Sequence, residues 1–298
     1  MLQACIHELE QSREQGMATL LVCHHSLEGV MCGIGLTYLA HMSQDAVRLC
    51  SDPSTQPMLG ERTVLCPSPQ SDEAITLAQR VYKGVATSIS TGCSRIRNGS
   101  CPRNCDSACI GKIRYACAAD DRRMPEVVHR FACLAFSRGP SIRNMPTNPH
   151  VIALDELARH TLNECERTRQ FMRFRKLCNG DYMSVFEPAA NTLPFVAHHF
   201  AERMRQNRFC MVDPAHNVVA VHKSGSRSCS LAYVDTQLIH TLLDERVYSD
   251  DDAYVQAMWK HFYDSLALSG RDASQRGYDL RAHWIPKRLW ANLPELQD

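Results

Sequence analysis

The sequence predicts an α/β (α+β) fold, with a small N-terminal α/β unit, a helical middle and a C-terminal mixed sheet of about four strands packed by helices. Short apolar runs bounded by Gly, Pro, Ser or Asn indicate strands, and longer stretches with apolar residues three or four apart indicate helices. Residues 139–149 contain three prolines in eleven positions and are typical of a connection. We therefore expect two domains, at residues 1–145 and 146–298.

The N-terminal unit should contain a strand over residues 18–25, a buried helix after it, and a second strand over residues 46–50. Residues 51–73 are rich in Pro, Ser and Gln and indicate a loop. Asp72 and Glu73 should begin the next helix, because acidic side chains stabilise a helix N-terminus. Helices should then dominate to about residue 140.

Two histidines and a serine, His24, His25 and Ser26, lie at the junction between the first strand and the loop after it. Adjacent residues on a strand point to opposite faces, so the two imidazoles do not easily chelate one metal. Two interpretations stay open: a catalytic or ligand role at the mouth of a pocket, or ordinary strand-end polarity.

The composition predicts a globular protein, because 44% apolar residues are enough to form a buried core. There is no run of 18 or more apolar residues, and the first residues lack the order of a secretory signal, so we expect a cytoplasmic protein with no membrane partner. The 15 cysteines are odd in number and scattered. Without export they indicate reduced thiols, several of which, at positions 23, 165 and 210, serve as small apolar residues.

Charge is uneven although the net charge is only +1. Residues 93–145 carry 10 Lys and Arg against 4 Asp and Glu, whereas residues 1–92 carry 5 against 9. A basic segment is either the footprint of a polyanion, most commonly nucleic acid, or a solvated helical surface.

The same basic segment contains a metal-like pattern, Cys101, Cys105 and Cys109. Residues at i, i+4 and i+8 of a helix share one face, so three thiols can converge there. The spacing matches neither paired C-x-x-C zinc knuckles nor ferredoxin runs. Metal or iron–sulfur binding and the packing of reduced cysteines are the two alternatives.

The C-terminal domain alternates helices and strands. We expect helices over residues 153–177 and 193–206 and strands over residues 182–186, 209–212, 218–222 and 229–234. A final helix begins at the acidic run 249–252, and its buried face should carry Val255, Trp259, Phe262 and Leu266.

Cations cluster near the end of the first of these helices, where Arg169, Arg173 and Lys176 align at i, i+4 and i+7. They either contact phosphate or complement the helix dipole. Trp284 and Trp290 lie among Lys and Arg in the C-terminal tail, where they either stack on bases or attach the tail to the domain.

Several of these motifs occur in an order that resembles one family. They are FMRFRKL, the segment from Glu187-Pro188 through Leu193-Pro194 and His199-Phe200-Ala201 to Arg203, the following Asp213, and Pro286-Lys287-Arg288 with Trp290. The family is a DNA-metabolism or DNA-repair family encoded beside a radical-SAM protein, and its C-terminal half is a domain of unknown function. The resemblance covers about residues 165–294, and LLVCHHSLEGVMCGIGLTYLA resembles the family's first strand and helix. The chain departs from the family pattern at His24-His25 and at Glu166. The Cys-rich middle is also peculiar to this chain.

The resemblance implies DNA as a partner, together with a radical-SAM protein and a link to uracil-DNA glycosylase domains, but no known reaction or cofactor. The matching positions suited to phosphate are Arg173, Arg203, Arg271, Lys287, Arg288 and, by stacking, Trp290. Glu187, His199 and Asp213 are suited to acid–base work.

Three functions follow as hypotheses. The first is a DNA-associated protein that acts with the radical-SAM partner. The second is an enzyme on nucleic acid or a nucleotide that uses Glu187, His199 and Asp213, and the third is a metal or iron–sulfur protein. Neither a phosphate-binding GxxxxGK[ST] loop nor a G-x-S-x-G elbow occurs in the sequence, so the common enzyme signatures do not choose among them.

Overall fold

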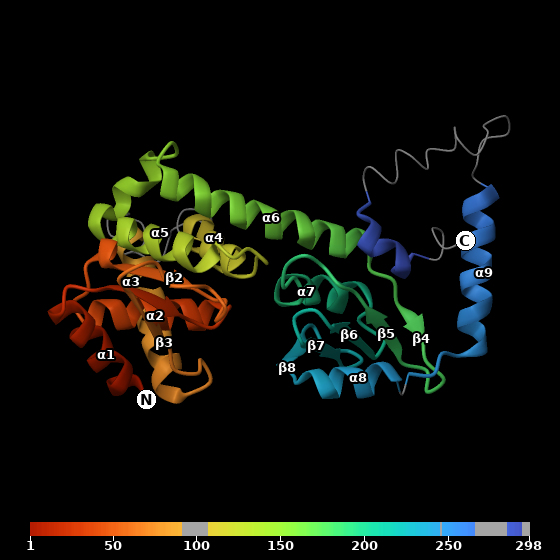
Figure 1. Ribbon diagram of the computed structural model, residues 1–298. Helices are drawn as coiled ribbons and strands as arrows, with labels where there is room; N and C mark the ends of the chain where they lie inside the picture. Colours follow the sequence, from red (N-terminus) through yellow and green to blue (C-terminus); the bar gives the residue numbers. More distant parts are fainter. Residues whose placement is uncertain (91–106, 245, 266–284, 294–298) are drawn as a thin grey trace. The chain divides into compact units, whose positions relative to one another are not determined.

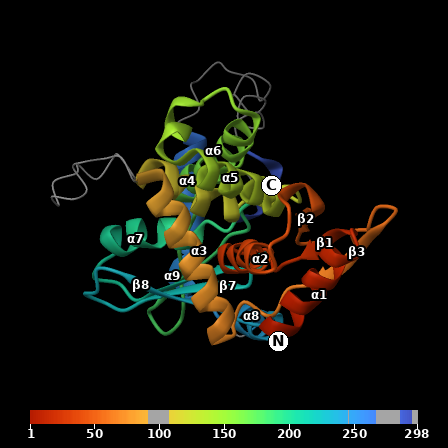
Figure 2. The ribbon, with the colours of Figure 1, turned by 90° about the vertical axis from the view of Figure 1, so that its left-hand side faces the viewer.

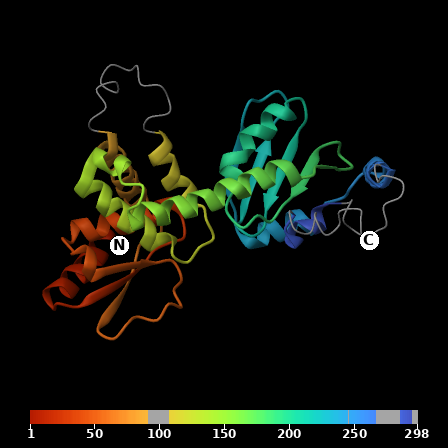
Figure 3. The ribbon, with the colours of Figure 1, turned by 90° about the horizontal axis from the view of Figure 1, so that it is seen from above.

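The computed structural model describes the chain except residues 91–106, 245, 266–284 and 294–298 (Figure 1). It divides into two compact units, Met1–Leu162 (unit 1) and Asn163–Asp298 (unit 2). The helix α6, Pro149–Phe171, spans the division between them and is the long helix of Figure 3. The predicted α/β class is confirmed, whereas the domain boundary at residues 145–146 stays a prediction.

Unit 1 contains a three-stranded parallel sheet of order β2-β1-β3. The strands are β1 (Ala18–Val22), β2 (Val47–Cys50) and β3 (Glu61–Leu65), and β1 pairs in parallel with both neighbours. The central strand is the most apolar because both of its faces are covered, and Leu20 and Leu21 are fully buried.

The third strand lies inside the region that the sequence predicted to be a loop, so that prediction was wrong. Within β3 only Val64 is buried, and the strand occupies an edge of the sheet. Its first residue, Glu61, forms a two-pronged ion pair with Arg48 of β2, at 3.2 and 2.8 Å. A strand that buries one side chain leaves no apolar run for sequence analysis to detect.

The helices of unit 1 are α1 (Leu2–Glu14), α2 (Leu27–Leu39), α3 (Asp72–Ser90), α4 (Ser107–Cys117) and α5 (Met124–Arg138). Short 3-10 turns, η1 (Gln44–Ala46) and η2 (Gly139–Asn144), precede β2 and follow α5. The helix α2 packs on α3, α1 lies beside β3, and α5 packs on β2 (Figure 2).

The start of α2 is built on the turn after β1. The Ser26 hydroxyl accepts a hydrogen bond from the Gly29 N–H at 3.0 Å and so caps the helix. A Cβ on Gly29 would lie 2.3 Å from the carbonyl oxygen of His24, so glycine is required there. His25 bonds the Ser51 hydroxyl at 2.8 Å and the Ala119 carbonyl at 2.9 Å. Local hydrogen bonding therefore explains two of these three strand-end residues.

Unit 2 contains a five-stranded mixed sheet of order β4-β5-β6-β7-β8, where about four strands were expected. The strands are β4 (Arg175–Lys176), β5 (Tyr182–Val185), β6 (Phe209–Asp213), β7 (Val218–His222) and β8 (Cys229–Tyr233). Only β5 and β6 pair in parallel, joined through helix α7 (Leu193–Arg203); the other pairs are antiparallel.

The helix expected over residues 153–177 ends earlier, at Phe171. The chain then enters β4, whose Arg175 and Lys176 pair with Met183 and Tyr182 of β5. Tertiary strand pairing thus overrides the helical pattern of the sequence. The predicted alignment of Arg169, Arg173 and Lys176 on one helix is therefore wrong.

Beyond the sheet lie α8 (Thr236–Asp244), α9 (Asp250–Ser265) and the 3-10 turn η4 (Lys287–Asn292). The predicted buried face of α9 is wrong, because Val255 is 54% and Trp259 41% exposed. Phe262 and Leu266 lie outside the described side chains. The helix is instead attached at its N-terminus, where Asp252 is buried.

The cysteines that the structure describes are free thiols, and Cys23 and Cys165 are buried as expected, while Cys210 is half-buried. In the described ranges, each helix is too short or too polar to cross a membrane.

Candidate nucleic-acid interface

A groove of about 570 Å³ lies in unit 2 where the end of α6, the segment leading to β4, α7 and α9 meet. Its lining combines cationic, aromatic and flexible apolar side chains: Arg169, Gln170, Met172, Arg173, Phe174, Phe200, Arg203, Met204, Val255, Gln256 and Trp259. Cations beside exposed aromatic rings are the side chains that hold phosphates and stack on bases.

Three arginines supply the charge of the groove, and two of them, Arg173 and Arg203, were predicted from the sequence. Arg203 is exposed, and within the described ranges it makes no ion pair or side-chain hydrogen bond. Arg169 pairs with Glu166, which is itself exposed, and Arg173 donates to the Gln170 carbonyl at 2.9 Å. Because Glu166 is exposed, its ion pair with Arg169 is weak, and a phosphate competes with it at little cost.

Aromatic rings form the floor of the groove. Phe174 meets Phe200 and Phe209 edge to face, with ring centroids 5.3 and 5.2 Å apart, and Phe209 stacks on His222 at 4.5 Å. These contacts fix Phe174 between α7 and the sheet. Trp259 borders the groove from α9 and exposes a large part of its ring.

The position of α9 within unit 2 is set by ionic contacts with β4. Asp252 accepts from Arg175 Nε at 2.8 Å and from the Lys176 N–H at 2.9 Å. The Arg175 guanidinium also lies 3.5 Å from the ring centroid of Tyr248. Because Asp252 is buried, both hydrogen bonds are shielded from water and hold the first turn of the helix that carries Trp259.

The other predicted phosphate ligands lie elsewhere. Arg271 is outside the described residues, and Lys287 is exposed on η4. Arg288 donates to Glu164 Oε2 at 2.5 Å, and Trp290 Nε1 donates to the Ile285 carbonyl at 3.0 Å. Arg288 and Trp290 thus have structural partners, and their contact with nucleic acid stays a prediction.

Glu164 joins three parts of unit 2. Its buried carboxylate accepts from Arg167, from the Ala189 N–H at 2.9 Å and from Arg288. Burial acts to raise its pKa, but these three donors together lower it below the usual value. The side chain thus stays ionised and ties η4 to α6 and to the segment after β5.

The predicted acid–base residues are only partly brought together. Asp213 is the last residue of β6, and the exposed Glu187 lies two residues after the neighbouring parallel strand β5, so both lie at the carboxyl ends of these strands. His199 is exposed on α7, where its ring meets Phe200 edge to face at 5.1 Å. Within the described ranges no hydrogen bond links any two of these three residues.

Asp213 has a partner that the sequence did not reveal, His216, whose Nδ1 lies 2.7 Å from the buried carboxylate. Asp213 also accepts from the N–H groups of Ala215 and His216 and so shapes the turn after β6. Burial raises the pKa of Asp213, and the hydrogen bonds from His216 offset only part of that effect. The pair can orient an imidazole for proton transfer, and it also closes the turn.

The metal hypothesis falls largely outside the described residues. Cys101 and Cys105 are not described, and of Cys109 only the backbone position in α4 is. In the described part of the chain, no three His, Cys, Asp or Glu side chains gather as metal ligands.

Phe174 and Trp259 are groove residues that the sequence did not predict as site residues. The signal for Phe174 is the alternation of aromatic and cationic residues in FMRFRK, residues 171–176. The helical spacing of apolar residues led to the wrong prediction that Trp259 is buried. Such spacing predicts a buried face whether or not another element covers that face.

Three comparisons with known proteins were made. No curated protein matches the chain. A solved structure described as a DHH domain of a member of a family of ribosomal proteins is similar at 10% identity. The similarity covers 75% of this chain and 78% of that one, with a TM-score of 0.39. A family model described as a domain of unknown function, DUF4130, matches residues 122–295. Since the match covers more than half of the sequence, the chain belongs to the DUF4130 family.

Proposed function

We propose that the chain is a DNA-associated protein and that the groove of unit 2 is its nucleic-acid interface. The observation that carries the proposal is the gathering of Arg169, Arg173 and Arg203 with Phe174 and Trp259 around one groove. Guanidinium groups bind phosphates without sequence preference, and exposed rings stack on any base. Because a flat ring needs an unpaired base, we expect a preference for single-stranded DNA or for a base displaced from a duplex.

The test is the affinity of the purified protein for labelled single-stranded and duplex DNA, measured by fluorescence anisotropy over a range of salt concentrations. Log affinity should fall steeply with log salt, and each phosphate contact to a single strand should add about 0.7 to the slope. Arg203→Ala should therefore reduce the slope by about 0.7, and Trp259→Ala should cost about 1–3 kcal/mol with the slope unchanged.

The matched control is Arg227→Ala, which removes the same charge from an exposed position in the β7–β8 connection, outside the groove. It should leave both affinity and slope close to those of the unmodified protein. An absence of binding at low salt overturns the proposal, as do equal effects of Arg203→Ala and Arg227→Ala. Lys287→Ala tests separately whether η4 extends the interface.

A role in DNA repair with a radical-SAM partner rests on the family resemblance, as does the link to uracil-DNA glycosylase. It is tested by mixing the purified protein with the radical-SAM protein and measuring complex formation by analytical ultracentrifugation, with and without DNA that carries a damaged base. We expect a complex that the damaged strand strengthens. Independent sedimentation of the two proteins under both conditions contradicts the partnership and leaves the DNA proposal standing.

A second candidate function is an enzyme on nucleic acid or a nucleotide. The observation in its favour is the Asp213–His216 pair, in which His216 Nδ1 lies 2.7 Å from Asp213 Oδ2. Asp213 ends β6, and Glu187 lies just beyond the end of the parallel neighbour β5. Glu187→Gln and His216→Gln should each lower turnover of a DNA or nucleotide substrate while DNA affinity is unchanged. Unchanged turnover in both variants counts against the enzyme.

A further inference from the structure

Unit 1 holds a second cavity, of about 340 Å³, between the end of α2 and α5. Its lining includes Tyr38 and Phe136, whose rings meet edge to face at 5.2 Å, and also Cys133 and His129. The volume suits a molecule of a few heavy atoms, and the aromatic wall suits an uncharged one.

The thiol and the imidazole lie on one face of α5, because residues 129 and 133 are four apart in a continuous helix. The His129 side chain is 2% exposed, and its Nδ1 makes no hydrogen bond within the described ranges. A buried imidazole with an unsatisfied nitrogen is costly unless the site uses it. His129 is thus a polar group lining a cavity and left partly unsatisfied in the described chain.

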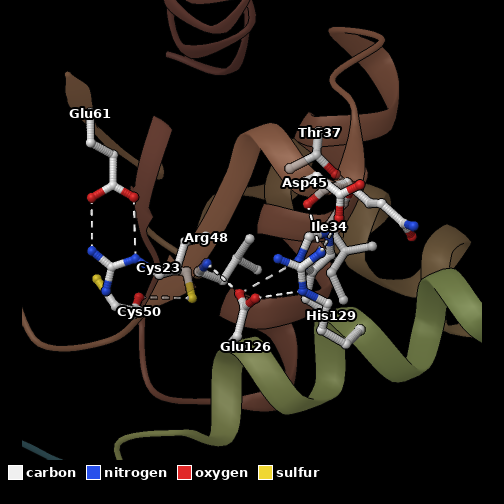
Figure 4. Close-up of polar contacts among 12 residues, drawn as sticks. Cys23, Ile34, Thr37, Asp45, Arg48, Cys50, Glu61, Glu126 and His129 are labelled. Atoms are coloured by element: carbon white, nitrogen blue, oxygen red, sulfur yellow. Dashed lines mark hydrogen bonds and ion pairs between the residues drawn. The ribbon is translucent and has the colours of Figure 1, made fainter. Parts of the chain in front are cut away.

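A carboxylate also lies beside the imidazole. Glu126 Oε2 lies 3.7 Å from His129 Nδ1, one helical turn before it (Figure 4). Glu126 is held by the Leu49 N–H of β2 at 2.8 Å and by Arg130 Nε at 2.6 Å, and Arg130 also donates to the Gln44 carbonyl at 2.8 Å. The carboxylate is therefore fixed before any ligand enters.

The pKa shifts of Cys133 and His129 agree with an interaction between these two side chains. Burial alone raises the pKa of the Cys133 thiol, but His129, Tyr38 of α2 and Arg130 together lower it below the usual value. Burial acts to lower the pKa of His129, yet Cys133 and Glu126 raise it to about 9. In contrast, burial raises the pKa of Cys5 and Cys23, in the same unit, to about 12. The neighbours of Cys133 favour a thiolate beside an imidazolium.

We propose that Cys133, His129 and Glu126 form a nucleophilic site for small, uncharged acyl donors, with Cys133 as the nucleophile, His129 as the acid–base group and Glu126 as a positioning residue. The order nucleophile, base and orienting carboxylate is what covalent acyl transfer requires. Glu126 acts only through His129.

The step is balanced within the site. The Cys133 thiolate attacks the acyl carbon, a C–S bond forms, and the bond from that carbon to the leaving group breaks with its electron pair. The His129 imidazolium gives its proton to the leaving group, so a neutral alcohol or thiol departs and a thioester stays on Cys133. Nothing is oxidised or reduced.

The probe is p-nitrophenyl acetate with the full chain, with p-nitrophenolate release followed by absorbance and the acetylated residue identified by peptide mass spectrometry. We expect a burst of one equivalent and acetyl on Cys133. Cys133→Ser should remove the burst, and His129→Gln should slow it about 100-fold, which is the lower range of acid–base contributions. Glu126→Gln should slow it less and shift its pH profile.

Cys178→Ser is the control, because Cys178 is an exposed thiol of unit 2 far along the chain from the site. It should leave the burst unchanged. The pH profile separates catalysis from packing: the rate of the unmodified protein should reach its plateau at a lower pH than that of His129→Gln. Acetylation of Cys178 without Cys133 overturns the proposal, and so does an equal rate in His129→Gln with unchanged circular dichroism.

Discussion

Replacement of Glu164 by Gln should destabilise unit 2, because Glu164 is the buried acceptor that joins three of its segments. The side chain is 1% exposed and accepts from Arg167, Ala189 and Arg288. Gln keeps the shape and one acceptor oxygen, so packing is preserved, but its NH2 group replaces the other acceptor and faces a donor. The variant therefore removes the charge and part of the hydrogen bonding without leaving a cavity.

The magnitude follows from the three bonds. A hydrogen bond to a charged group contributes about 1 kcal/mol more than a neutral one, which gives about 3 kcal/mol in all. Since both guanidinium partners are 38% exposed, solvent reduces the loss to roughly 2–3 kcal/mol. For a unit of this size, about 3 °C of Tm per kcal/mol gives a fall of roughly 6–9 °C.

Tryptophan fluorescence measures this loss in unit 2 alone, because the three tryptophans, at positions 259, 284 and 290, all lie there. Urea unfolding at pH 7 gives the difference in free energy of unfolding. The control is Glu166→Gln, two residues along α6 and 64% exposed, which should cost less than about 1 kcal/mol. A loss of similar size in both variants refutes the reasoning.

The pH dependence gives a further check on the same variant. Because the folded pKa of Glu164 is lowered, its contribution is fully present above the unfolded pKa of about 4.3 and is lost as pH falls through the folded value. The unmodified protein should therefore lose more stability on acidification below about pH 4.3 than Glu164→Gln does. Parallel pH profiles contradict the assignment.

Four other substitutions test the fold. Gly29→Ala should destabilise unit 1 by about 1–3 kcal/mol, since the new Cβ meets the His24 carbonyl. Gly111→Ala in α4 is its control and should be neutral or stabilising, because there is open space around Gly111. Thermal melts followed by circular dichroism check both. Asp252→Asn should cost about 1–2 kcal/mol in tryptophan-monitored unfolding by weakening the contact of α9 with Arg175, and an unchanged midpoint argues against it. Phe186→Ala should cost about 3–5 kcal/mol in the same assay, because Phe186 is fully buried; a loss below about 1 kcal/mol refutes that account.

The sequence predicted the elements that bury a periodic apolar face. The strand β1, the buried helix after it and the β6–β7 pair have such faces, and the structure confirms them. It did not predict β3, which buries only Val64, or β4, which is two residues long. Short edge strands depend on pairing with distant residues, so their own side chains carry little of the pattern.

Sites were predicted less completely than elements. Arg173 and Arg203, which were predicted as phosphate ligands, both line the groove of unit 2, whereas Trp259 was assigned to a buried face. The pairing of Glu164 with Arg288 joins residues 124 positions apart, and no local pattern connects them. The role of Cys133 depends on Glu126 and His129 of its own helix, but also on a cavity whose other wall comes from α2.

The span from Glu164 to Arg288 also bears on how unit 2 is made. A ribosome adds about 5–20 residues per second, so the 124 residues between the two partners take about 6–25 s to synthesise. Throughout that interval Glu164 can meet Arg167 and later the Ala189 N–H, but not the Arg288 guanidinium. The full set of contacts around this buried carboxylate can therefore form only after Arg288 has been synthesised.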